Sequence, residues 1–238
     1  MRAGTRSRPT YRCYNGGVTK HQHQKSGAPE ARSDEVPATA PTYFECPQCG
    51  FLTADPEFGA GNAPCPFCSA PGDSRRVFPT ERLRRLDGRI RRYHDEGESE
   101  IVVILVAAFL EAILEDIIDR ILAARGADLS VREVVLDGQR AVGGRIGRLF
   151  PHLTGEQFED AAAELGYRAF PARWREVRAA RNSFIHDSPF NGPQESIDKA
   201  MAEEAMILLG QAYRLFVLIN NRFVADAHAP RCAPADGL

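Results

Sequence analysis

An arginine, an asparagine and a histidine lie close together in the stretch R-N-S-F-I-H, which runs from Arg181 to His186. A guanidinium keeps its positive charge at physiological pH and can bind two phosphate oxygens at once. An imidazole can accept or donate a proton near neutral pH. Asn182 adds a small amide that can orient either group. These residue types in this spacing suit chemistry on a phosphodiester.

Four cysteines form two Cys-x-x-Cys pairs, Cys46 with Cys49 and Cys65 with Cys68, and fifteen residues separate the pairs. Each pair turns tightly enough for both thiolates to face one ion, and four thiolates complete a tetrahedral shell around Zn²⁺. Such a shell leaves no open position for a substrate, so we expect a structural zinc ion. A redox or iron site is the alternative. The pattern resembles a zinc ribbon over residues 43–72, with nearby aromatic residues as its apolar shell.

Helical periodicity dominates from about residue 98 onward and predicts the elements that must position the Arg–His stretch. Apolar residues recur at helical spacing in 100–125, from 131, in 155–165, in 171–187 and in 195–225, and glycine or proline separates these segments. The pattern predicts an all-α domain over residues 98–226, a bundle of four to five helices. No segment outside the cysteine unit shows sustained strand alternation.

The predicted helix 171–187 carries the Arg–His stretch near its C-terminal end. Arg178, Asn182 and His186 fall on one stripe at positions i, i+4 and i+8, and Arg181 lies about 100° away from Asn182. At the helix C-terminus the macrodipole favours a protonated imidazole. We expect the opposite face to be anchored by apolar side chains: Trp174, Val177 and Phe184 or Ile185.

The remaining segments differ in composition from the helical domain. Residues 1–42 are polar and rich in Gly, Ser, Pro and basic residues, and we interpret them as a disordered tail; residues 227–238 read as a flexible tail. Residues 73–97 form a linker and a basic helix. Within it, positions 75–92 hold eight arginines against two acids. Such a local basic stripe can attract RNA or DNA, although a solvated helix face is an equally good interpretation.

Composition limits the classes of function. The chain has 238 residues and a net charge of −2, so it is not a uniformly basic ligand of nucleic acid. The longest apolar run, Ile101 to Leu110, is too short to cross a bilayer. The N-terminus shows no apolar signal segment, and paired Cys-x-x-Cys units favour metal binding in a reducing compartment. We therefore expect a cytoplasmic protein that does not bind membranes.

Two other groups of residues could do chemistry. Glu111, Glu115 and Asp119 follow one another at helical spacing and could bind Mg²⁺, although a solvated helix face is the simpler explanation. The segment G-G-R-I-G at positions 143–147 faintly resembles a phosphate-binding loop but lacks the Lys-Ser/Thr of a P-loop. Close packing of helices explains those glycines better.

The Arg181–His186 stretch resembles the hallmark of the HEPN superfamily, R-x4-6-H with a polar residue, often Asn, directly after the Arg. Its place on the penultimate helix of an all-α domain also fits, and the resemblance covers about residues 98–225. It implies a metal-independent endoribonuclease that acts as a homodimer, with the motifs of two copies facing each other. It further implies a toxin–antitoxin, CRISPR-associated or antiviral setting, with an antitoxin or defence protein as a partner.

The resemblance also implies a role for each motif residue. Arg181 would stabilise the scissile phosphate, His186 would act as general acid or base, and Asn182 would orient the imidazole or the phosphate. The product would carry a 2′,3′-cyclic phosphate. Other HEPN proteins keep the fold without catalysis, so a zinc-ribbon adaptor for dimerisation or for binding nucleotide or nucleic acid is the alternative. A zinc-dependent DNA-binding regulator is a third possibility.

Overall fold

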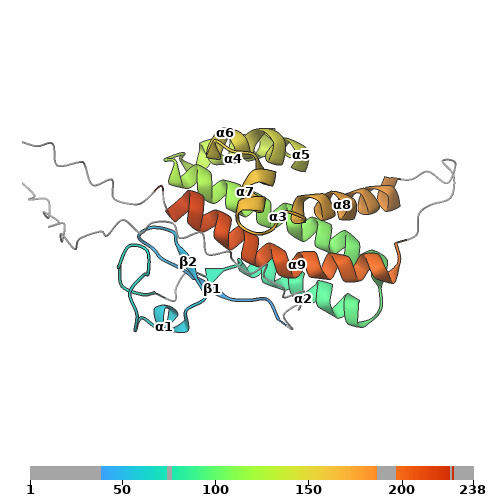
Figure 1. The fold of residues 1–238 in the computed structure, drawn as a ribbon, viewed down its shortest axis with the longest axis horizontal. Helices are drawn as coiled ribbons and strands as arrows, with labels where there is room; N and C mark the ends of the chain where they lie inside the picture. The colour runs from blue at the N-terminus through green and yellow to red at the C-terminus, as the bar shows by residue number, and fades with distance from the viewer. Residues whose placement is uncertain (1–38, 74–76, 187–196, 226, 228–238) are drawn as a thin grey trace, which may run out of the picture. The chain divides into compact units, whose positions relative to one another are not determined.

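Two long helices form the centre of the core in the computed structural model. Helix α3 (Ser99–Ala124) is apolar around much of its circumference and buries twelve side chains, and a helix of this kind must be covered on several sides. Helix α9 (Lys199–Asn220) packs along it (Figure 1). The rings of Phe109 and Tyr213, one from each helix, lie 5.3 Å apart between their centroids.

The structure describes residues 39–73, 77–186, 197–225 and 227, with only the backbone of His186. All of them belong to one compact unit that spans residues 32–238. The tails predicted at 1–42 and 227–238 fall almost entirely outside the described residues. Within those residues, we find no helix that is both long enough and apolar enough to span a membrane.

Helices α2 (Glu81–Asp95) and α8 (Phe170–His186) lie on either side of the α3–α9 pair (Figure 1). Leu83 and Ile90 of α2 are buried, and so are Trp174 and Val177 of α8. Leu83 and Ile90 are two helical turns apart, and Trp174 and Val177 are about one turn apart. Each pair therefore lies on one face of its helix, and that face packs against the core.

A buried polar network ties α2 to α9. The hydroxyl of Tyr213 donates to Oδ1 of Asp87 at 2.9 Å, and Arg91 donates to both oxygens of the same carboxylate, through Nε at 2.7 Å and Nη2 at 3.0 Å. Asp87 is buried, so its charge must be paired and hydrogen-bonded to be tolerated there. Three donor contacts meet that requirement.

Short helices connect α3 to α8. They are α4 (Leu129–Gly138), α5 (Val142–Gly144), a π-helical turn (Arg145–Leu149), α6 (Phe150–Thr154) and α7 (Phe158–Glu164). Asp128 begins α4 by accepting a hydrogen bond from the N–H of Val131 at 2.9 Å. Phe150 and Phe158 pack edge to face with centroids 5.4 Å apart, and Phe158 also meets Trp174 of α8. This aromatic cluster fixes the start of α8 against the core.

A small antiparallel sheet accompanies the cysteines. Its strands are β1 (Tyr43–Glu45), β2 (Leu52–Thr53) and β3 (Val77–Phe78), in the order β2-β1-β3. Phe44 pairs with Thr53 on one side of β1 and with Val77 on the other. A short helix, α1 (Pro56–Gly59), follows β2. The chain is thus mostly helical with a three-stranded sheet beside four clustered cysteines, which confirms the sequence prediction at this level.

Candidate functional site

The two Cys-x-x-Cys segments form matching turns. In the first turn the N–H of Cys46 donates to the carbonyl oxygen of Phe51 at 2.9 Å. In the second turn the N–H of Cys65 donates to the carbonyl oxygen of Ala70 at 2.7 Å. Each bond spans five residues and folds the chain back on itself, so both thiols of a pair point to the same side.

The residue after the second cysteine has a left-handed backbone in each turn. Gly50 has φ of 72° and Ser69 has φ of 62°, and each donates its N–H to the carbonyl oxygen of the first cysteine of its pair, at 2.9 and 2.8 Å. Glycine adopts this conformation at little cost, whereas a serine there is strained. The turns are therefore set by backbone geometry as well as by the cysteines.

The four sulfur atoms converge on one point. Sγ of Cys46 lies 3.6 Å from Sγ of Cys68, Sγ of Cys49 lies 3.8 Å from Sγ of Cys65, and all four lie within 4.8 Å of one another. Thiolates about 2.3 Å from a tetrahedral metal ion stand about 3.8 Å apart. The four cysteines could therefore hold one metal ion such as zinc. Among the described residues, this is the one such cluster of His, Cys, Asp and Glu.

Burial and hydrogen bonding act differently on the four thiols. Burial raises the pKa of Cys49 and of Cys68. Burial also acts against ionisation of Cys46, but hydrogen bonds from the backbone at Cys49 and Gln48 hold its pKa below the ordinary value. A divalent cation deprotonates the thiols that coordinate it, so metal binding at this cluster would release protons.

An apolar shell closes around the sulfurs. Phe58 is fully buried against the cysteines, and the rings of Phe51 and Phe67 stack with centroids 5.6 Å apart. Gly59 lies against the ring of Phe44, where any Cβ would clash. Three of the cysteines are buried and Cys68 is partly exposed, and four thiolates would fill a tetrahedral shell without leaving a position for a substrate. The geometry therefore favours a structural metal centre over a catalytic one.

The side chain of Asn221 attaches the sheet to the end of α9. Its Oδ1 accepts from the N–H of Leu52 at 2.7 Å, and its Nδ2 donates to the carbonyl oxygen of Leu52 at 2.8 Å. The neighbouring Asn220 donates to the carbonyl oxygen of Gly50 at 2.9 Å. One amide thus occupies the outer edge of β2, as a further strand would. Asn221 begins a π-helical turn (Asn221–Ala225) that follows α9.

An ionic contact adds a second attachment. Arg120 of α3 donates to Glu45 of β1 at 2.9 Å and to Asp116 at 3.0 Å, and its guanidinium lies over the ring of Phe78 at 5.4 Å. Burial raises the pKa of Asp116, against the opposing influence of Arg120. Leu52 and Phe78 belong to the same apolar core as the long helices. The cysteine unit and the helices therefore form one packed body.

The Arg–His stretch lies at the C-terminal end of α8. Arg181 is half-buried, and its Nη1 donates to Oδ1 of the exposed Asn182 at 2.9 Å. Nε of Arg181 is buried without a hydrogen-bond partner, and no acid pairs with this arginine in the part of the chain that the structure describes. His186 is the last residue of α8, and its side chain lies outside the described residues. The structure thus brings Arg181 and Asn182 together and leaves the imidazole unplaced.

The two alternatives for the third anchor of α8, Phe184 and Ile185, are both exposed. Trp174 and Val177 are buried as expected, but Phe184 is 39% exposed and Ile185 is 46% exposed. At about 100° per residue, these four side chains share one face of the helix with Arg181. Trp174 and Val177 thus anchor the expected face, but among the described residues the end of α8 is less covered than its start. A cation flanked by exposed apolar side chains is the result.

The other residues that could do chemistry have structural partners. The three carboxylates of α3 each face an arginine, which accounts for them without Mg²⁺: Glu111 with Arg178 at 4.0 Å, Glu115 with Arg145 at 2.8 Å, and Asp119 with Arg132. In the segment 143–147, Arg145 also donates to the carbonyl oxygen of Gln139 at 2.7 Å. Its guanidinium is buried and occupied, so this segment does not offer a phosphate site.

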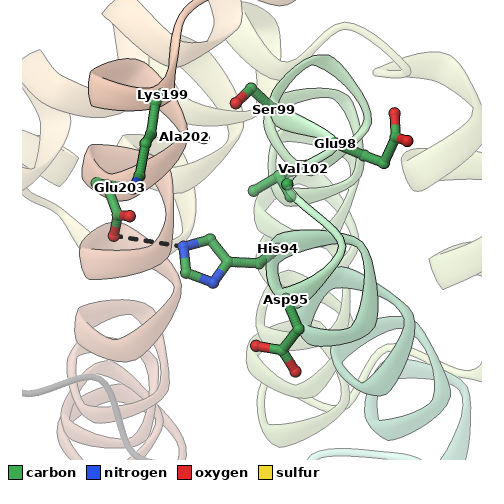
Figure 2. Close-up of a pocket in the computed structure, with 9 residues that line it drawn as sticks. His94, Asp95, Glu98, Ser99, Val102, Lys199, Ala202 and Glu203 are labelled. Atoms are coloured by element: carbon green, nitrogen blue, oxygen red, sulfur yellow. Dashed lines mark ion pairs between the residues drawn. The ribbon is translucent and has the colours of Figure 1, made fainter.

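A pocket of about 350 Å³ lies between the end of α2 and the starts of α3 and α9. Figure 2 shows His94 directed at Glu203, with Nε2 and Oε2 3.3 Å apart. Lys199 is the one lysine or arginine among its described lining residues, against the three carboxylates of Asp95, Glu98 and Glu203, so the lining does not favour a phosphate ester. The sequence contains no signal for this pocket, because His94 and Glu203 are far apart in the chain.

No protein-family model matches the chain, and comparison with curated proteins and with solved structures gives no match either.

Proposed function

We propose that the helical domain is a metal-independent endoribonuclease of the HEPN type. The observation that carries this proposal is the state of Arg181, a half-buried guanidinium beside Asn182 with no acidic partner among the described residues. Most arginines that stabilise a fold are paired with a carboxylate, as Arg145 and Arg120 are here. A positioned cation without such a partner remains available for phosphate oxygens.

The reaction proposed for this site is cleavage by the 2′-hydroxyl of RNA. The 2′-oxygen attacks phosphorus, the bond from phosphorus to the 5′-oxygen breaks, and a 2′,3′-cyclic phosphate and a free 5′-hydroxyl result. Arg181 stabilises the charge that develops on the phosphoryl oxygens. His186 transfers the proton, from the attacking hydroxyl or to the leaving oxygen. Asn182 holds the guanidinium in place through its Oδ1.

A second copy of the chain is proposed to complete the site. Arg181 lies on the same helical face as the exposed Phe184 and Ile185. Phe184 and Ile185 beside Arg181 support such a contact, because aromatic residues and arginine are enriched in protein interfaces. Across a two-fold axis each copy would place its α8 end against the other, so that two motifs face one substrate.

The metal proposed for the cysteine cluster is Zn²⁺ in a structural role. Four thiolates at tetrahedral spacing are a soft ligand set, which zinc accepts without a redox change. Through Asn221 and Arg120 this centre stabilises the face of the helical domain that it contacts. It takes no part in the proposed cleavage.

The test is cleavage of a 5′-labelled single-stranded RNA by the purified chain in the presence of EDTA. We expect cleavage products that end in a 2′,3′-cyclic phosphate, and none from the matching DNA, which lacks the 2′-hydroxyl. Arg181→Ala and His186→Ala should each lower the rate at least ~100-fold. Arg175→Ala is the matched control, because this exposed arginine of α8 pairs with Glu159 and should not affect the rate. Cleavage that survives both motif substitutions would refute the assignment.

A non-catalytic adaptor is the second candidate, and the exposure of Phe184 and Ile185 supports it as well. Under this alternative the same α8 surface serves dimerisation alone, and the chain binds nucleotide or nucleic acid without cleaving it. Light scattering would then give the mass of a dimer, the wild type would leave RNA intact, and Phe184→Asp would produce a monomer. A defence or antitoxin partner belongs to either proposal.

A further inference from the structure

Four arginines form an exposed stripe along α2. Arg82, Arg85, Arg89 and Arg92 are all solvent-exposed and follow one another at i, i+3, i+7 and i+10. At about 100° per residue they fall within an arc of about 80°, and at about 1.5 Å per residue they extend over about 15 Å. We call these four residues the α2 stripe. The opposite face of α2 carries the buried Leu83 and Ile90.

The other two arginines of α2 do not belong to this surface. Nε of Arg84 donates to the carbonyl oxygen of Pro79 at 3.0 Å, and Arg91 forms its two bonds to the buried Asp87. Both are used within the fold. Two arginines of α2 therefore hold the helix in place, and four are exposed to solvent. The amino-acid composition alone could not distinguish the two groups.

The charge of the α2 stripe is poorly compensated. In the described parts of the chain, Arg82 and Arg89 form no ion pair. Arg82 lines a small pocket with Glu115, Asp116 and Asp119, but these three carboxylates are paired with other arginines. Arg85 lies 3.9 Å from Glu81 and Arg92 lies 3.6 Å from Glu96, and all four of these side chains are more than half exposed. Exposed pairs of this kind contribute little and exchange readily for another anion. The two acids also lie at the ends of the helix, beyond the stripe itself.

We propose that the α2 stripe binds the phosphodiester backbone of single-stranded RNA, the substrate class of the proposed ribonuclease, on which this inference rests. A single strand carries one charge per about 3.4 Å, so a stripe of about 15 Å spans about four phosphates. Successive arginines stand about 4.5–6 Å apart along the helix axis, within reach of successive phosphates. Each guanidinium can bind two phosphate oxygens.

The surroundings favour a nucleic acid over an acidic protein. None of the large apolar side chains that the structure shows exposed belongs to α2, so this face lacks the apolar centre typical of a protein interface. The ring of Tyr93 is half-buried at the edge of the stripe, and the Arg92 guanidinium lies over it at 4.8 Å. This contact holds the Arg92 guanidinium at the edge of the stripe.

The stripe and the Arg181 region are separate surfaces. Helix α2 and helix α8 lie on either side of the α3–α9 pair (Figure 1). Substitutions in the stripe therefore leave the contacts of Arg181 unchanged, and RNA binding can be measured independently of cleavage.

The experiment measures binding of the full chain to a labelled 2′-O-methyl RNA, which has no free 2′-hydroxyl and cannot be cleaved. Fluorescence anisotropy gives Kd at a series of salt concentrations for the wild type and for Arg82→Gln combined with Arg89→Gln. Arg148→Gln combined with Arg168→Gln is the control, because both of these arginines are exposed elsewhere and the change in charge is the same. Circular dichroism verifies that both variants keep their helices.

We expect the α2 variant to reduce the slope of log Kd against log salt by about 1.4, which corresponds to two phosphate contacts at about 0.7 each. Its affinity at low salt should fall about tenfold or more, while the control variant should match the wild type. Single-stranded DNA should show the same loss, since the contacts are to the backbone. Equal slopes for the two variants would overturn the proposal. Polyglutamate serves as a model of an acidic protein, and an α2 variant that loses binding to polyglutamate but keeps its binding to RNA would also overturn it.

The outcome is separable from the proposed cleavage. A wild type that fails to cleave RNA, but whose binding depends on the α2 stripe, would refute the ribonuclease and leave the stripe as an RNA-binding surface. Cleavage with unchanged binding of the α2 variant would refute the stripe and leave the ribonuclease.

Discussion

Replacement of Asn221 by leucine should detach the cysteine unit from the helices. The amide of Asn221 satisfies both backbone groups of Leu52 at once, with donor–acceptor distances of 2.7 and 2.8 Å. Leucine has similar volume and no hydrogen-bonding atom. It would leave a buried N–H and a buried carbonyl oxygen of β2 without partners, because Leu52 itself is almost inaccessible to solvent.

The magnitude follows from these two bonds. A buried backbone group left unpaired costs about 1–3 kcal/mol. Partial access of water through the edge of the sheet reduces this cost, so the two groups together should lower the free energy of unfolding by about 2–4 kcal/mol. Asn221→Asp keeps the acceptor for the Leu52 N–H but loses the donor, so the lost hydrogen bond alone should account for about half of this change. Additional loss is expected from the carboxylate facing the Leu52 carbonyl oxygen.

Urea unfolding followed by circular dichroism would measure the change, and hydrogen exchange would locate it. The N–H of Leu52 should lose protection in the leucine variant, while amides in the middle of α3 keep theirs. Asn62→Leu is the control, since Asn62 lies in the same unit but is exposed and bonds only to Glu57 among the described contacts. The control should stay within about 0.5 kcal/mol of the wild type. Equal effects of the two substitutions, or unchanged exchange at Leu52, would refute the reasoning.

Three further outcomes are expected. Cys49→Ser removes one of four converging thiols, and elemental analysis should show the bound metal falling from about one ion per chain to almost none. Gly50→Ala places a Cβ 2.8 Å from Cγ1 of Val224 and forces an alanine into a left-handed backbone conformation. It should therefore lower the free energy of unfolding by about 1–3 kcal/mol. Ser69→Gly at the matching position of the second turn should not destabilise the protein. Burial and the Asp87 carboxylate raise the pKa of Tyr213 above the ordinary value of 10.0. Its contribution to the free energy of unfolding is therefore fully present below pH 10, and it is lost as the pH rises further. Unfolding midpoints measured from pH 8 to 11 should therefore fall above pH 10, and less steeply in Tyr213→Phe, which should be less stable than the wild type at pH 8.

The features that were predictable from the sequence are those encoded over short distances. Two Cys-x-x-Cys turns predict converging thiols because each turn is local, and the four sulfurs do converge. Helical periodicity predicted α8 over 171–187, and the helix spans Phe170–His186. The predicted last helix reaches residue 225, where the π-helical turn ends. In each case neighbouring residues contain the information.

Long-range contacts could not be predicted. The bond between Leu52 and Asn221 joins residues 169 positions apart, and an asparagine near a helix end has no distinctive pattern. Strand β3 is only two residues long, too short for alternation to be visible. Periodicity identified the face of α8 that carries Phe184 and Ile185, but it could not reveal whether any neighbour covers the end of that face. The separation of the α2 arginines into paired and exposed ones depends on tertiary contacts for the same reason.

The position of Asn221 in the chain has a consequence for biosynthesis. Its partner Leu52 is made 169 residues earlier. At about 5–20 residues per second, the outer edge of β2 waits roughly 8 to 34 s for the amide that covers it. The four thiols lie within 22 positions of one another and can capture a metal ion during this interval. In a chain synthesised when metal is scarce, the edge of β2 would be open during this interval and no metal ion would hold the cysteine unit together. Open strand edges promote aggregation. The yield of folded protein should therefore depend on the metal supply during translation more strongly than the finished protein depends on it afterwards.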